Sequence, residues 1–212
     1  MINDSNPNIP ELGEVMPGLA SDGTTLVNSQ FLGGRKAFPV RDFSMTSLPS
    51  PPLTGAWLTA ILLRNISGAA ILPGRLARLC DAGSGSYGND FGLVEAVEGY
   101  GNAVNLDTVV LLDPWLPSAG LLDDMIGWFV ISGPAPGYTP QLAATAQGDI
   151  AVGELIVCSA DAQGRVTRAL ATPASATAAR DQAAGVLGRA MSARLDGETD
   201  AVIWVNWHSP VF

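Results

Sequence analysis

The sequence predicts an all-β protein of two small barrel-like or sandwich-like modules, with an extended N-terminal arm and little helix. From Leu58 onward, short apolar runs are separated by Gly, Pro, Asn and Asp at intervals of about eight to twelve residues, which is typical of all-β chains. The 24 Gly and 15 Pro among 212 residues supply the turns between these runs. The best helical window, residues 174–184, is mostly Ala and has no apolar face.

The first 54 residues are predicted to form an arm. They contain scattered prolines and short apolar pieces, without a sustained period of 2 or 3.6 residues. Proline fixes φ and lacks an N–H donor, so such a segment is suited to lie along another surface and unsuited to the middle of a sheet. The predicted organisation is an arm over residues 1–54, a first module over 55–134 and a second over 135–212.

Nine segments are predicted as strands: residues 57–64, 74–80, 93–97, 104–112, 126–132, 155–159, 166–170, 186–194 and 201–208. The last two flank Asp196-Gly197, a pair that favours the positive φ of a tight hairpin turn. In the final segment Trp204 and Trp207 fall on opposite faces, and both faces are largely apolar. This strand is therefore expected to be covered on both sides, inside a sandwich or at a contact between subunits.

The two modules are predicted to be related by an internal repeat. Asp124, Trp128 and Pro134 match Asp200, Trp204 and Pro210 at one offset of 76 residues. Earlier in each half, two glycines precede an apolar strand that ends at a cysteine, Cys80 or Cys158. A repeat of this kind indicates two similar β-units packed on one another. The two cysteines are either buried thiols or one disulfide.

The composition argues against several partners and cofactors. There are 20 Asp and Glu against 11 Lys and Arg, a net charge of −9, and Lys36 is the single lysine. Because phosphate binding needs clustered cations, no nucleic-acid partner is expected. One His and two Cys cannot build a four-cysteine, two-cysteine/two-histidine or three-histidine zinc site. No metal and no other cofactor is expected. With no secretory signal and no run of 18 apolar residues, the sequence predicts synthesis in the cytoplasm and no membrane partner.

No catalytic residues are predicted, and the protein is expected not to be an enzyme. Residues 83–88 satisfy G-x-G-x-x-G, but no helix and no βαβ alternation follow them. Asp113 with Asp123 or Asp124 offers paired acids, although neighbouring residues of a strand point in opposite directions. His208 precedes a serine, but the chain has no G-x-S-x-G motif.

Six segments, taken in order, resemble capsid cement or decoration proteins of tailed bacteriophages. They are N-x-S-G-A-x-[IL]-x-x-G-x-L at 65–76, V-L-L-D-P-W-L-P at 110–117, D-x-x-x-W-F-V-I-x-G-P at 124–134, G-D-x-x-x-G-x-L-x-x-x-x-x-D-A-x-G-R-V at 148–166, G-V-L-G-R-A-M at 185–191 and V-x-W-V-N-W at 202–207. The resemblance covers about residues 57 to 208 and rests on order and spacing. It implies a β-rich structural protein on the virion surface, assembled in the host cytoplasm. Such a protein binds the outer face of the capsid and cements neighbouring major capsid subunits.

Within that resemblance, two sets of residues are expected to make contacts. The arm residues expected to bind the capsid are Phe31, Arg35, Lys36, Phe38, Pro39, Arg41 and Phe43. Trp204 and Trp207 are expected to join copies in a dimer or trimer, because Trp buries a large area at low side-chain entropy. The alternative function is a carbohydrate- or receptor-binding module of a tail or fibre protein, with an exposed Trp115 that stacks on sugar.

Overall fold

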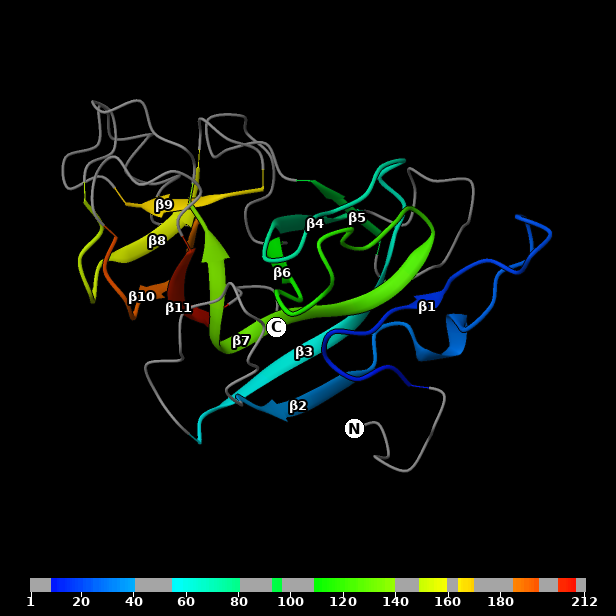
Figure 1. The fold of residues 1–212 in the computed structure, drawn as a ribbon, viewed down its shortest axis with the longest axis horizontal. Coiled ribbons are helices and arrows are strands. Elements are labelled where there is room, and N and C mark those ends of the chain that lie inside the picture. Colours follow the sequence, from blue (N-terminus) through cyan, green and yellow to red (C-terminus); the bar gives the residue numbers. More distant parts are fainter. Residues whose placement is uncertain are drawn as a thin grey trace.

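A computed structural model describes residues 9–40, 55–80, 93–96, 109–139, 149–159, 164–169, 185–194 and 202–208. Its strands are β1 (Met16–Pro17), β2 (Arg35–Pro39), β3 (Trp57–Asn65), β4 (Leu76–Cys80), β5 (Leu93–Ala96), β6 (Val109–Leu112), β7 (Met125–Tyr138), β8 (Leu155–Cys158), β9 (Val166–Arg168), β10 (Val186–Ala190) and β11 (Val202–His208). Among the described residues the only helical element is a 3₁₀ turn, η1 (Ser29–Phe31). The all-β prediction is confirmed (Figure 1).

Each of the nine predicted strands coincides with an observed one, from β3 to β11. The predicted 174–184 window, the 83–88 motif and the Asp196-Gly197 turn lie outside the described residues, as do Arg41 and Phe43. The arm contributes two further strands that the sequence did not predict. β1 pairs with β7, and β2 pairs with β3 over all five of its residues. β2 occupies the end of the sheet, which is where a strand containing Pro39 can be tolerated.

The strands follow one continuous path in the order β2-β3-β5-β4-β6-β7-β11-β10-β8-β9. β3 also pairs directly with β7, so β3, β5, β4, β6 and β7 close a ring of five hydrogen-bonded strands. The pairing of β3 with β5 is parallel, and the remaining pairs are antiparallel. These five strands thus enclose part of the core.

The predicted internal repeat is present in the strand pairing. In the first unit the order is β5-β4-β6-β7, and in the second it is β9-β8-β10-β11, with every pair antiparallel. The turns repeat as well: Gly74 donates its N–H to Leu112 O, and Gly153 donates to Ala190 O. The carbonyls of Trp128 and Trp204, the two tryptophans matched in sequence, each accept an N–H from the residue that follows β6 or β10.

The two units are joined edge to edge through β7 and β11. Seven residue pairs link these strands, from Val202–Tyr138 to His208–Ser132, and β7 bends sharply where it passes from β3 to β11 (Figure 1). The sequence placed the end of this strand at Ser132, because Gly133 and Pro134 follow. At the bend, Gly133 has a φ of 94°, which glycine adopts without steric cost. Pro134 and Pro136, which lack an N–H donor, are tolerated in β7 because β3 pairs with β7 only as far as Ser132. The predicted division after residue 134 therefore falls within β7.

Apolar side chains fill both faces of the central strands. On β3, Leu58, Ala60 and Leu62 pack in a large cluster that also contains Trp128 and the second unit's core. Ile61 and Leu63, which point the other way, pack in a second cluster around Phe129. This double burial explains why β3 reads as a continuous apolar run without alternation.

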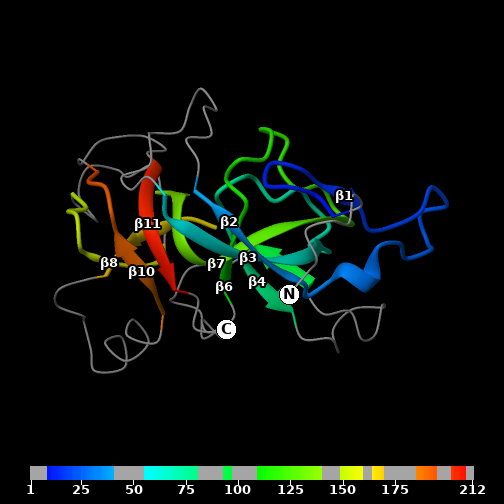
Figure 2. The same ribbon diagram turned by 90° about the horizontal axis from the view of Figure 1, so that it is seen from below.

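The described part of the arm, residues 9–40, packs on the sheet and is hydrogen-bonded to it. Leu12 and Met16 are buried in the large cluster, and the indole Nε1 of Trp128 donates to Pro10 O at 2.7 Å. Figure 2 shows the arm, in blue, lying against β3 and β7. Residues 9–40 are thus part of the folded unit, which corrects the prediction of an arm separate from the two modules.

Candidate functional site

The arm residues expected to bind a capsid have different degrees of exposure. Phe38 is 4% exposed and packs edge-to-face on Trp128, with ring centroids 5.1 Å apart. Lys36 forms a 2.8 Å ion pair with Glu11, whereas Arg35 is exposed. Phe31 and Pro39 are half-buried. Phe38 therefore has a packing role, and its side chain offers almost no surface to a partner.

Trp204 and Trp207, expected at a contact between copies, are buried within the single chain. Trp204 is 2% exposed and Trp207 5%, and the indole Nε1 of Trp207 donates to Ala135 O at 3.0 Å. Because their surfaces are already covered by β7 and the core, neither side chain is available as an exposed aromatic anchor. The structure thus corrects the sequence argument that selected these two residues, since the covering layer is the chain itself.

Trp115, which was expected to be exposed and to stack on sugar, is buried. Trp115 is 2% exposed and packs in the large core cluster, so no exposed ring is present at that position. The exposed tryptophan is Trp57, at 62%, which opens β3 and pairs with Pro39 of β2. Sequence reasoning missed Trp57 because it begins an apolar run; its place two residues after Gly55, at the start of that run, was the available signal.

Asp113 is the described acid with the most perturbed environment. It is fully buried, and burial raises its pKa to about 6 despite hydrogen bonds from two backbone N–H groups. Its Oδ2 accepts from Gly13 N at 2.6 Å, and its Oδ1 accepts from Trp115 N at 2.9 Å. Both oxygens thus hold backbone in place, one of them in the arm, so this carboxyl fastens the arm to the loop after β6.

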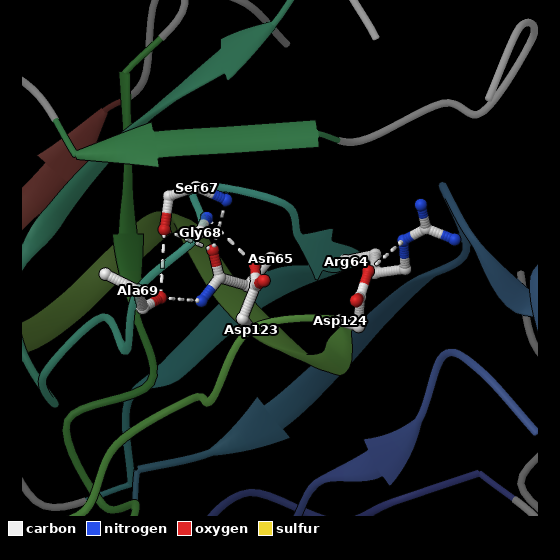
Figure 3. A network of polar contacts seen from close by, with 7 residues as sticks. All are labelled: Arg64, Asn65, Ser67, Gly68, Ala69, Asp123 and Asp124. Carbon is white, nitrogen blue, oxygen red and sulfur yellow. Dashed lines mark hydrogen bonds and ion pairs between the residues drawn. The ribbon is translucent and has the colours of Figure 1, made fainter. Parts of the chain in front are cut away.

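The other two acids of the considered catalytic set lie in a polar network at the end of β3 (Figure 3). Asp123 Oδ1 accepts from Gly68 N at 2.9 Å, and Asp124 Oδ1 lies 3.9 Å from Arg64 Nε. Asp124 has φ 62°, a left-handed conformation that Asp tolerates better than most residues. The two carboxylates therefore serve different partners and do not face each other as a catalytic pair.

Asn65 is the centre of this network. Its Nδ2 donates to Ala69 O at 2.7 Å and to Leu121 O at 2.9 Å, while its Oδ1 accepts from Ser67 N and Ser67 Oγ. The side chain is fully buried, so these four bonds satisfy its hydrogen-bonding groups. The network rigidly fixes two loops at one end of the first unit.

A hollow of about 580 Å³ lies on the second unit, across β7, β8, β10 and β11. Its polar lining residues are Ser132, Arg189, Asn206 and His208. Among the residues that the structure describes, no group of three metal-ligating side chains occurs, and no helix has the length and apolar character to cross a membrane.

Comparison of the chain with protein families, with curated proteins and with solved structures found no match.

Proposed function

We propose that this protein is a structural component of a tailed-phage virion. In this proposal it binds the outer surface of the capsid and cements neighbouring major capsid subunits. The proposal is supported by the six ordered segments described above, which extend from Asn65 to Trp207 and include most of β6, β7, β8, β10 and β11. Its partners are the major capsid protein and further copies of itself.

A continuous sheet is suited to this role. The two units share seven paired residues between β7 and β11, and the arm is tied to both β3 and β7. A force applied across the molecule is then borne by many backbone hydrogen bonds together. Many copies on a lattice gain avidity, and binding only to the mature shell stabilises that shell by mass action.

The observation that carries the proposal is the exposed Trp57 beside the terminal strand β2. Trp57, on β3, is 62% exposed and pairs with Pro39 at the end of β2. Arg35, at the beginning of β2, is also exposed. Tryptophan and arginine are the side chains most enriched at the energetic centres of protein interfaces. We therefore assign the capsid contact to this edge, in place of the buried Phe38.

Two measurements test the proposal. The first is the copy number of this chain in purified particles from its source, by quantitative mass spectrometry against the major shell protein. A ratio near that of the shell protein supports a cement role. A few copies per particle indicates a tail or fibre module, and absence from particles contradicts a virion role altogether.

The second measurement is binding to expanded shells. Trp57→Ala should reduce the fraction of chain that sediments with the shells, while Leu122→Ala should not. Leu122 is a matched control because it is also an exposed apolar residue, at 53%, and it lies near the opposite end of β3. Equal binding of both variants, at unchanged thermal stability, would remove the assigned contact.

A further inference from the structure

In the sheet at the hollow on the second unit, Trp207 has a glycine on each side. Gly133 of β7 and Gly188 of β10 are the residues paired with Trp207 on its two sides. A Cβ at Gly188 would lie 2.2 Å from Asn206 O, and a Cβ at Gly133 would lie 2.5 Å from Trp57 O. The close approach of the neighbouring backbone thus requires glycine at both positions.

Polar side chains converge on this space from neighbouring strands. Asn206 pairs with Arg189, and His208 pairs with Ser132. Asn206 and His208 are two residues apart on β11, so all four side chains rise from the same face. Within the described part of the chain, the side chains of Ser132, Asn206 and His208 have no hydrogen-bond partner, so they are available to a ligand.

Arg189 is oriented by the protein and keeps free donors. Its Nη1 donates to Gly153 O at 2.9 Å, which fixes the guanidinium while its other N–H groups stay available for a carboxylate. No described residue that lines the hollow is acidic. The nearby Glu154 is engaged elsewhere, by Ala151 N at 2.8 Å and by Arg168 at 3.6 Å.

We infer that this hollow binds a carboxylate presented by an acidic segment of a protein partner. Its volume of about 580 Å³ falls in the range of ligand pockets, and Leu155 and Val186 supply an apolar wall for the methylene groups of a Glu side chain. A protein segment is favoured over a free small molecule because Arg189, Asn206 and His208 are all exposed. The site therefore lies open on the sheet face and does not enclose its ligand. The inference is independent of the capsid proposal.

The single histidine of the chain allows a direct test. His208 gives the only imidazole resonances in an NMR spectrum, and these report on the hollow without assignment. At constant pH, an acetylated and amidated hexaglutamate peptide should shift them saturably, and a hexaglutamine peptide should not. Arg189→Gln should weaken binding of the hexaglutamate peptide about tenfold or more, since a charge-assisted bond is lost.

Arg35→Gln is the matched control, because it removes the same charge from an exposed residue of β2, outside the hollow. An unchanged amide spectrum verifies that each variant is folded. No shift of His208, or equal affinity in Arg189→Gln, would overturn the site. Saturation by glutarate at the same carboxylate concentration as the peptide would overturn its assignment to a protein segment. Since the test uses the isolated chain, its result is separable from that of capsid binding.

Discussion

The backbone N–H of Gly13 donates a 2.6 Å hydrogen bond to the buried carboxylate of Asp113, one hundred residues further along the chain. The same carboxylate accepts from Trp115 N at 2.9 Å. One side chain thus ties the arm to the loop after β6, at a position from which water is excluded. This contact links the attachment of the arm to the protonation of one group.

Asp113 should make the protein more stable in mild acid than at neutral pH. Burial raises its pKa from 3.8 to about 6, so the folded state binds the proton more tightly than the unfolded chain does. The stabilisation is fully present below pH 3.8 and is lost as pH rises through 6. One pKa unit corresponds to about 1.4 kcal/mol, so the contribution to the free energy of unfolding is about 3 kcal/mol.

Urea unfolding between pH 4 and pH 7 measures this contribution as the difference between the wild type and Asp113→Asn, which cannot titrate. The pH dependence should be smaller in Asp113→Asn. Asp22→Asn is the control, because hydrogen bonds from Thr25 and Thr24 lower the pKa of Asp22 from 3.8 to about 2, so its contribution changes only below pH 4 and its removal should leave the profile between pH 4 and pH 7 unaltered. Identical pH profiles for the wild type and Asp113→Asn would contradict the prediction.

Gly18 is predicted to be essential for seating the arm. A Cβ at this position would lie 2.1 Å from Asp124 O and 2.6 Å from Arg64 Cδ, so Gly18→Ala must displace either the arm or the turn before β7. Gly23→Ala is the matched control, since no atom lies within 4 Å of a Cβ at Gly23. Only its positive φ of 69° makes alanine unfavourable there, which costs about 1 to 2 kcal/mol of unfolding free energy. We expect the larger loss of unfolding free energy, by chemical denaturation, in Gly18→Ala; the reverse order would show that the arm is not held at this point.

The limits of sequence prediction are clearest in the arm. Strands β3 to β11 were predictable because their apolar runs are bounded by Gly, Pro and Asp. β2 has the sequence RKAFP, with neither alternation nor an apolar run, and it is a strand because residues 57–61 of β3 pair with all five of its residues. β1 is only two residues long and depends likewise on β7. Both segments are strands because they pair with residues distant in the sequence, and a local sequence pattern does not contain that information.

The site residues show the same limit. Both faces of β11 are apolar around Trp204 and Trp207, and both tryptophans are buried, but the sequence could not say whether the cover is another copy or the chain itself, nor that Asn206 and His208 stay exposed. It likewise could not distinguish the exposed Trp57 from the buried Trp115, since each is flanked by apolar residues and turn formers. The hollow was also not predictable, because it depends on register: glycines of β7 and β10 both fall opposite Trp207.

Asn65→Ala is expected to destabilise the first unit strongly. The variant removes two donors and one acceptor, which bind the buried Leu121 O and the part-buried Ala69 O and Ser67, and each buried group left unpaired costs about 1 to 3 kcal/mol. Asp123→Ala is the control within the same network, since it removes one exposed hydrogen bond, to Gly68 N, and should cost less than about 1 kcal/mol. Thermal unfolding of the two variants measures the difference, and equal melting temperatures would mean that the network does not stabilise the fold.

Cys158 should behave as an inert thiol until the protein unfolds. It is free and 2% exposed, and burial raises its pKa to about 12. The thiolate is the reactive form, so at pH 8 only roughly one thiol in ten thousand is reactive in the folded state. In a Cys80→Ser variant, where Cys158 is the sole thiol, a disulfide reagent should label it fully in urea and hardly at all in native buffer. Its labelling rate should then rise with urea in step with unfolding, as followed by tryptophan fluorescence. Rapid labelling in native buffer would instead mean that β8 separates from β9 or β10 without global unfolding, since Cys158 pairs with Val166 at that edge of the sheet.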